Sequence, residues 1–274
     1  MLKQRILTAL ALLPVALGGV FLLTQEWFAL FAGAVISLAA WEWAKLSGFT
    51  AVWQRLLYTT LTGGLLLCLF SLSALPLSFI LGVGLVWWLV ALMLVISYPD
   101  SRAAWKPLLV QLLIGLMVLV PAWAGLVFLK SQSAPEFEQL GNALILYVFM
   151  LVWGADIGAY VFGRKFGRRK LAPHLSPGKT WEGVLGGQLV ITLIALGVGW
   201  YRALELFPML GLLAMTWAVG LVSVLGDLLE SMFKREQGLK DSSRLLPGHG
   251  GIMDRIDSLT AAIPVFAVFW MLAS

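Results

Sequence analysis

Apolar residues run in long blocks along almost the whole chain, and short polar segments separate these blocks. A helix that crosses the hydrocarbon core of a bilayer needs about 20 mainly apolar residues. The pattern reaches about that length nine times and therefore predicts nine transmembrane helices. The predicted spans are 6–23, 27–45, 56–75, 78–97, 107–129, 142–163, 183–201, 208–230 and 258–273.

The composition favours the same class of protein. Of the 274 residues, 60% are hydrophobic and only 12% are charged, whereas a soluble domain carries about 25% charged residues. So few charges cannot cover a soluble protein of this size. We therefore expect an all-α polytopic integral membrane protein, not a soluble enzyme, a disordered chain or a coiled coil. We expect one membrane domain over 1–274, with N-terminal spans in 1–141 and the catalytic part in 142–274.

Lysine and arginine are distributed unevenly between the two sets of loops that nine spans create. Seventeen of these residues fall in one set, and only Lys130 and Arg202 fall in the other. Basic loops usually remain in the cytoplasm. We therefore expect a cytoplasmic N-terminus in a multi-pass protein of the inner (cytoplasmic) membrane. The same distribution explains the formal net charge of +5 without a nucleic-acid partner.

Two loops on the predicted cytoplasmic side, 164–182 and 231–257, are longer than the other connections. Long loops in compact proteins are usually functional or disordered. These two are rich in glycine, proline, histidine and paired charges, which is unusual for plain linkers. We therefore expect the active site on the cytoplasmic side, where these loops meet.

Four acidic residues lie within predicted spans, where a carboxylate costs about 2.5–3.5 kcal/mol at the bilayer centre. They are Glu42, Asp156, Asp227 and Glu230. Asp156 and Asp227 each lie about two helical turns from a basic loop. Small neighbours such as Gly158 and Gly226 allow close helix packing, which favours one shared polar pocket.

The alternative is that each acid pairs with an arginine and only stabilises the bundle. For Glu42, near the end of its span, contact with interfacial water is an equally good interpretation.

The loop 231–257 combines three features of a metal–phosphate site. Lys234, Arg235, Lys240 and Arg244 supply positive charge in groups. A turn over 247–251 contains three glycines and His249, and glycine lets backbone N–H groups approach an anion. Asp254 and Asp257 share one face if they are helical, and such carboxylates suit Mg²⁺. We expect Asp254 to meet Asp227 across the last helical hairpin. The alternative, a basic loop for anionic lipid headgroups, leaves Asp227, Asp254 and the glycines unexplained.

The other long loop contains Ser176-Pro177-Gly178-Lys179-Thr180. This segment is not a P-loop, because Pro173 stands where that motif needs glycine. We interpret it as a helix start, with Ser176 as N-cap and Pro177 at the first helical position. The exposed amides and Lys179 would then form an anion site at the helix N-terminus.

The segment 231–257 resembles the signature of the bacterial phosphatidate cytidylyltransferase (CDP-diacylglycerol synthase) family. The segments 176–183 and 226–228 also resemble that family. The matching signature residues are Ser231, Lys234, Arg235, Lys240, Asp241, Pro247, His249, Gly250, Gly251, Asp254, Arg255 and Asp257. A pattern of a dozen fixed positions within 27 residues is highly specific.

The resemblance implies that CTP and phosphatidate react to give CDP-diacylglycerol and pyrophosphate, with Mg²⁺ as the cofactor. The expected partners are then CTP, phosphatidate and membrane lipid. Whether the protein forms a homodimer is a separate question that the resemblance leaves open. The implied metal ligands are Asp227, Asp254, Asp257 and Asp156. The implied catalytic residues are Asp227, Asp254, Lys234, Arg235, Lys240, His249 and Arg255. The implied substrate-binding residues are Lys179, Ser176, Thr180, Gly250, Gly251, Asp241 and Arg244.

Two other functions compete with this interpretation. A transporter for an anionic solute would also use intramembrane acids and basic entrances, but it predicts inverted repeats and broken helices. The sequence shows neither feature. A CDP-alcohol phosphotransferase needs the pattern D-G-x2-A-R-x8-G-x3-D-x3-D in one span, and Asp254 and Asp257 do not supply that spacing. A purely structural membrane protein would not need metal-binding carboxylates.

Overall fold

The computed structural model describes residues 2–72 and 76–273, without the side chains of residues 2–7, 9 and 72. The side chains of Lys3 and Arg5 and the end of the third predicted span, 73–75, lie outside the described residues. The elements are α1 Leu2–Leu22, α2 Gln25–Leu46, α3 Val52–Leu72, α4 Leu77–Ile96, α5 Arg102–Trp105, α6 Leu108–Lys130, α7 Leu140–Phe166, β1 Lys170–Ala172, β2 Ser176–Thr180, α8 Trp181–Tyr201, α9 Leu206–Glu236 and α10 Met253–Ala273.

The helices confirm an all-α polytopic membrane protein. Apart from the short α5, each helix of the described chain coincides with one predicted span. Within the described residues, seven helices are long and apolar enough to cross a membrane: α2, α4, α6, α7, α8, α9 and α10. The other two long helices, α1 and α3, adjoin the partly described residues. The number of spans and the orientation of the N-terminus stay predictions.

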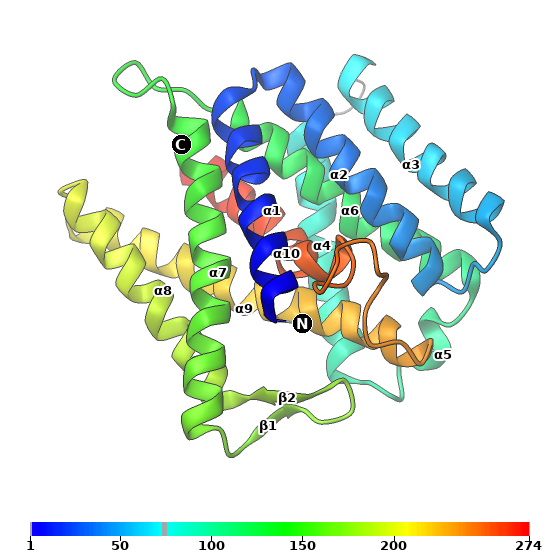
Figure 1. Cartoon of the computed structure of the whole chain (residues 1–274). Helices are drawn as coiled ribbons and strands as arrows, with labels where there is room; N and C mark the ends of the chain where they lie inside the picture. The colour runs from blue at the N-terminus through cyan, green and yellow to red at the C-terminus, as the bar shows by residue number, and fades with distance from the viewer. Residues whose placement is uncertain (1, 73–75, 274) are drawn as a thin grey trace.

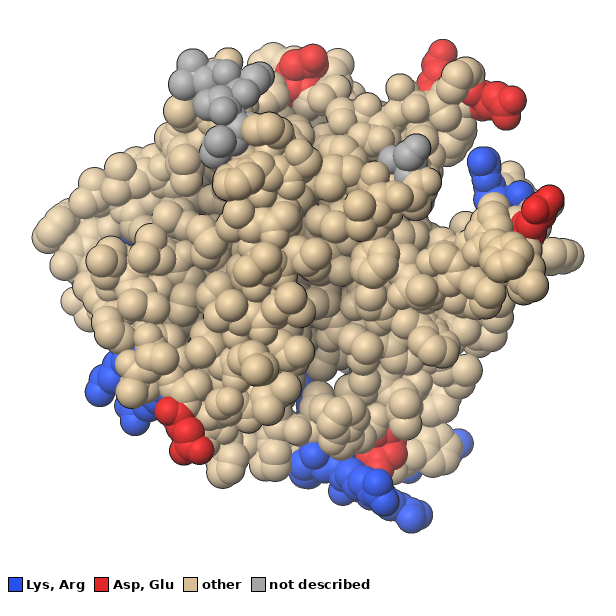
Figure 2. All heavy atoms as spheres, turned by 180° about the vertical axis from the view of Figure 1, so that it is seen from behind, with Lys and Arg blue, Asp and Glu red and all other residues tan. Residues whose placement is uncertain are grey.

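The surface has the character that a bilayer requires. Figure 2 shows one face that is almost entirely uncharged, with lysine, arginine and acidic side chains at its margins. Large apolar side chains such as Trp53, Met93 and Leu193 are more than 60% exposed. An exposed apolar surface of this kind is stable in lipid and unstable in water.

The core of the bundle is built around α10, which lies at the centre of the ribbon in Figure 1. This helix packs against α2, α4, α6, α7 and α9. Every residue from 258 to 268 is buried. Because protein surrounds α10, its first turn, which begins at Met253, has a fixed position relative to the other helices.

Glycines bring α7 and α8 into close contact. A Cβ atom at Gly158 would lie 2.6 Å from the carbonyl oxygen of Gly186 and 2.9 Å from the Cα atom of Gly187. Small residues permit such backbone contact between membrane helices. The contact fixes the segment of α7 that carries Asp156 against the start of α8.

The turns after α2 and α9 end these helices in the same way. Gly48 and Gly238 have positive φ angles of 96° and 64°. In each turn, two N–H groups donate to carbonyls of the last helical turn. After α2, the amides of Phe49 and Gly48 donate to Ala44 and Lys45. After α9, the amides of Leu239 and Gly238 donate to Lys234 and Arg235. This pattern is the Schellman motif. The two ends are neighbours, since a Cβ atom at Gly48 would lie 3.6 Å from Gln237.

The expected helix start at Ser176 is wrong. Residues Ser176–Thr180 form β2, which pairs antiparallel with β1 in a hairpin between α7 and α8 (Figure 1). A residue before proline is biased towards extended backbone, which applies to Ser176. The N-cap of α8 is Thr180, whose hydroxyl oxygen accepts a hydrogen bond from the Gly183 amide at 3.1 Å.

We predict that Gly158→Val destabilises the bundle by about 1–3 kcal/mol, the usual effect of overpacking. The added side chain would meet the backbone of α8, which cannot move aside easily. Thermal unfolding in detergent, followed by size-exclusion chromatography, measures the loss. Gly197→Val is the matched control, because an added Cβ atom on that exposed side of α8 meets nothing within 4 Å. Equal melting temperatures for the two variants would contradict the proposed packing.

Candidate active site

A cavity of about 440 Å³ lies between α7, α8, α9 and β2. Its charged and polar lining comes from three separate segments of the chain. These lining residues are Asp156, Tyr160, Arg164, Lys179, Thr180, Gln188 and Asp227. We call this cavity the α7–α9 pocket.

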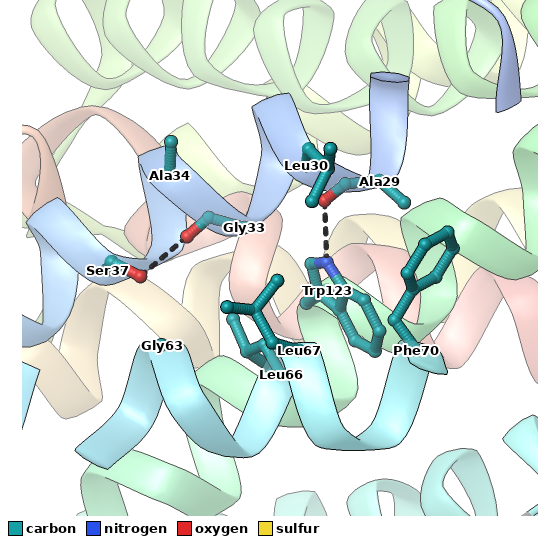
Figure 3. Close-up of a pocket in the computed structure, with 10 residues that line it drawn as sticks. All are labelled: Ala29, Leu30, Gly33, Ala34, Ser37, Gly63, Leu66, Leu67, Phe70 and Trp123. Atoms are coloured by element: carbon teal, nitrogen blue, oxygen red, sulfur yellow. Dashed lines mark hydrogen bonds between the residues drawn. The ribbon is translucent and has the colours of Figure 1, made fainter. Parts of the chain in front are cut away.

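A second cavity lies between α2, α3 and α6 and is lined by apolar residues (Figure 3). Its polar groups are satisfied internally. The Ser37 hydroxyl donates to the Gly33 carbonyl, and the Trp123 indole donates to the Ala29 carbonyl. No titratable side chain lines this cavity, so the α7–α9 pocket is the candidate active site.

An ion pair between β2 and α9 lines the α7–α9 pocket. Lys179 Nζ is 2.7 Å from Asp227 Oδ2, and both side chains are partly exposed, at 25% and 30%. The other carboxylate oxygen of Asp227 accepts a hydrogen bond from the Ser231 hydroxyl at 3.2 Å. Asp156 interacts electrostatically with Asp227 and Lys179. Asp156 and Asp227 therefore share one polar pocket, as the sequence predicts.

The α10 carboxylate beside Asp227 is Asp257. Gly226 allows α9 to contact the Asp257 backbone carbonyl directly. The Asp257 side chain interacts electrostatically with Asp227, Lys179 and Lys234. The predicted contact between Asp254 and Asp227 is wrong, because Asp254 lies one turn earlier on α10 and pairs with Lys234 instead.

Lys234 joins two buried carboxylates. Its ammonium group is 2.6 Å from Glu230 Oε2 and 2.8 Å from Asp254 Oδ1. Asp254 Oδ2 accepts two more hydrogen bonds, from the Ser242 and Gly251 amides, and shares the single proton of the Ser242 hydroxyl with Glu42 Oε2. Protein donors therefore contact both oxygens of Asp254. Glu230 is only 1% exposed, and its Oε1 atom has no hydrogen-bond partner.

Glu42 does not reach interfacial water, contrary to that interpretation of the sequence. It is fully buried, and both of its oxygens accept hydrogen bonds from the chain around the start of α10. The sequence pattern does not place Glu42 in the site, because its partners lie about 200 residues away. The only local signal is a carboxylate within an apolar span.

The glycine turn adopts the backbone expected for it. Gly248 and Gly250 have φ angles of 76° and 82°. A Cβ atom at Gly250 would lie 2.7 Å from Asp254 Oδ2, and one at Gly251 would collide with Ser242 and Glu42. The turn therefore wraps around carboxylates of the protein itself. Beside it, His249 Nδ1 is buried without a hydrogen-bond partner.

The remaining predicted residues are divided between the hairpin and the surface. Arg235 Nε donates to the carbonyl oxygen of Leu175 at 3.0 Å and so ties α9 to the hairpin. Ser176 lies on β2, outside the lining of the α7–α9 pocket. The predicted residues that are exposed are Asp156, Arg235, Lys240, Asp241, Arg244 and Arg255.

A family comparison identifies the class of the chain. Residues 3–273 match the model of the cytidylyltransferase family. The chain therefore belongs to the cytidylyltransferase family, and the resemblance seen in the sequence is confirmed.

Individual relatives extend the match over nearly the whole chain. The chain is 54% identical to the phosphatidate cytidylyltransferase of Pseudomonas aeruginosa, over 97% of this chain and 96% of the relative. It is 44% identical to the phosphatidate cytidylyltransferase of Haemophilus influenzae, over 98% of this chain and 99% of the relative. It is 35% identical to the phosphatidate cytidylyltransferase of Brucella suis, over 98% of this chain and 93% of the relative. The similarity therefore includes the N-terminal helices as well as the signature segment.

We predict that Arg235→Met loosens the hairpin without unfolding the bundle. Losing one hydrogen bond of about 1 kcal/mol should speed amide exchange in β1 and β2 by about fivefold. Hydrogen–deuterium exchange with mass spectrometry measures this change. Arg244→Met, at an exposed arginine of the next loop, is the matched control. Unchanged exchange in the hairpin of Arg235→Met would show that the contact with Leu175 does not hold it.

Proposed function

We propose that the protein transfers CMP from CTP to phosphatidate at the cytoplasmic face of the inner membrane. The products are CDP-diacylglycerol and pyrophosphate. One observation carries the proposal: a Lys179–Asp227 ion pair lies in a cavity between three membrane helices. The names of relatives that match almost the whole chain support the same reaction.

The charges near the pocket suit two polyanionic substrates. Arg164 and Lys179 line the cavity, and Arg255 interacts electrostatically with Asp156. Lys240 and Arg244 are exposed on the loop between α9 and α10. Phosphatidate keeps its acyl chains in the bilayer, so a site formed by the ends of membrane helices lies at the depth of its phosphate.

The chemical step needs no strong base. The phosphatidate phosphate is ionised near pH 7, and one of its oxygens attacks the α-phosphorus of CTP. A new P–O bond forms, the bond from the α-phosphorus to the bridging oxygen breaks, and pyrophosphate leaves with that electron pair. No proton has to move. Catalysis then consists of positioning the reactants and neutralising their charge, which Lys179 and Arg164 supply from this chain.

The pocket also suits a magnesium ion. In the described part of the chain, no three His, Cys, Asp or Glu side chains form a metal site on their own. Mg²⁺ is usually held by one or two carboxylates together with substrate phosphates, and Asp227 and Asp156 supply two carboxylates on the cavity wall. The pairing of Asp227 with the ammonium group of Lys179 supports a cation at this carboxylate. When bound there, Mg²⁺ would neutralise charge on the phosphates.

We predict that the purified protein moves base-labelled CTP into the organic phase when phosphatidate and Mg²⁺ are present in detergent micelles. EDTA should abolish the transfer, because the carboxylates of the pocket and the phosphates are all negatively charged and need a divalent cation between them. Omission of phosphatidate is the control for non-specific partitioning of the label. A folded, monodisperse sample that transfers no label, across several acyl chains and divalent metals, would refute the proposed function.

We predict that Asp227→Asn lowers turnover by about 100-fold or more, the usual effect of removing one essential electrostatic contact. The amide keeps the shape of the side chain but loses the charge that pairs with Lys179. Label transfer per folded molecule measures the effect. Glu136→Gln, at an exposed position before α7, is the control. Substantial residual activity in Asp227→Asn would exclude this residue as an essential ligand.

A further inference from the structure

We infer that Glu42 is a positioning residue for the reaction: from α2, its carboxylate fixes the start of α10 and the loop that precedes it. We call residues 237–252 the α9–α10 loop. The inference rests on the proposed function, because this loop carries much of the family signature. Glu42 lies outside that signature, in the N-terminal half of the chain.

The contacts of Glu42 form a symmetrical set. Oε1 accepts from the Ser243 hydroxyl at 2.5 Å and the Ile252 amide at 3.0 Å. Oε2 accepts from the Ser242 hydroxyl at 2.9 Å and the Met253 amide at 2.7 Å. An ionised carboxylate has no donor and has about four acceptor positions. Each oxygen therefore holds one hydroxyl and one amide.

Because Glu42 is buried, its carboxylate needs these hydrogen bonds. Glu42 is 0% exposed, and a buried carboxylate is strongly unfavourable unless it is paired or hydrogen-bonded. Two of its donors are backbone amides at the N-terminus of α10, where a negative charge is also favoured by the helix dipole. Glu42 thus caps α10 from another helix. Lys45, one turn further along α2, adds a hydrogen bond to the Ser242 carbonyl at 3.1 Å.

The contacts continue from Glu42 to the groups of the candidate site. The Ser242 hydroxyl lies between Glu42 Oε2 and Asp254 Oδ2, at 2.9 Å and 2.8 Å. Asp254 then binds Lys234, which lies on α9 about two turns after Asp227. A change at Glu42 therefore shifts Ser242 and Asp254, and with them the glycine turn that packs against both carboxylates.

The chemistry of the contacts requires a carboxylate, not merely a side chain of this size. A glutamine presents one acceptor oxygen and one N–H₂ donor. Whichever way it turns, its N–H₂ group faces one backbone amide, which can only donate, and one serine hydroxyl, which must turn its proton away to accept. Glu42→Gln therefore keeps the packing of α2 but loses one amide contact and forces one serine hydroxyl to reverse its hydrogen bond. A residue that only filled space would tolerate this change.

The test compares Glu42→Gln with wild type by hydrogen–deuterium exchange and by label transfer per folded molecule. We expect faster exchange in residues 242–253 and a kcat lowered by about 10- to 100-fold, as for small misplacements of reacting groups. Trp43→Phe is the matched control: it removes a buried hydrogen bond from Trp43 Nε1 to the Gln111 carbonyl of α6 and keeps an aromatic ring against Phe233 of α9. We expect a lower melting temperature for this control and a kcat close to that of wild type.

A second variant approaches the same contact from the loop. Ser243→Ala removes one donor to Glu42 and leaves α2 intact, so it tests the inference even if Glu42→Gln folds poorly. Its effect on kcat should not add fully to that of Glu42→Gln, because both changes act on the same set of hydrogen bonds around Glu42. Wild-type exchange and wild-type kcat in either folded variant would overturn the inference, as would full additivity. Wild-type protein without label transfer would refute the proposed function instead, and the exchange comparison still decides whether Glu42 holds the loop.

Discussion

The structure depends on how it stabilises carboxylates buried beside a membrane. A buried charge without a partner is strongly destabilising, yet Glu42, Glu230 and Asp254 all lie within the protein. Lys234 binds Glu230 and Asp254, while hydroxyls and backbone amides bind Asp254 and Glu42. These contacts connect α2, α9, α10 and the loop between the last two. Removing one of these groups leaves a partner unsatisfied, so the arrangement holds together as a unit.

This arrangement explains how the N-terminal helices take part in the site. The signature segment contains the glycine-rich α9–α10 loop, which contacts from another helix hold in place. Glu42 and Lys45 supply that support from the end of α2, and the neighbouring turns after α2 and α9 end in the same motif. The N-terminal helices therefore position the C-terminal half as well as hold the protein in the membrane. A match to relatives over nearly the full length agrees with this dependence.

The sequence predicts the helices well because a run of about 20 apolar residues has one main physical solution in a bilayer. It also predicts the shared pocket of Asp156 and Asp227, since both acids lie at similar depth beside basic loops. It does not predict the partners of Glu42, because hydrogen bonds to residues about 200 positions away leave no local pattern. The helix start at Ser176 fails for a related reason: pairing with β1 places this segment in a hairpin.

The family signature and the ion pair of the α7–α9 pocket lie in different places. Asp254 and Gly251 belong to the family signature, and their polar groups are occupied by the protein itself. Lys179 and Asp227 lie outside that 27-residue segment, are each partly exposed and make a single ion pair with one another. An incoming phosphate or cation replaces such a pair at far lower cost than a saturated buried carboxylate. The signature segment therefore reads as the scaffold of the site, and the pair between β2 and α9 as the part that meets the substrates.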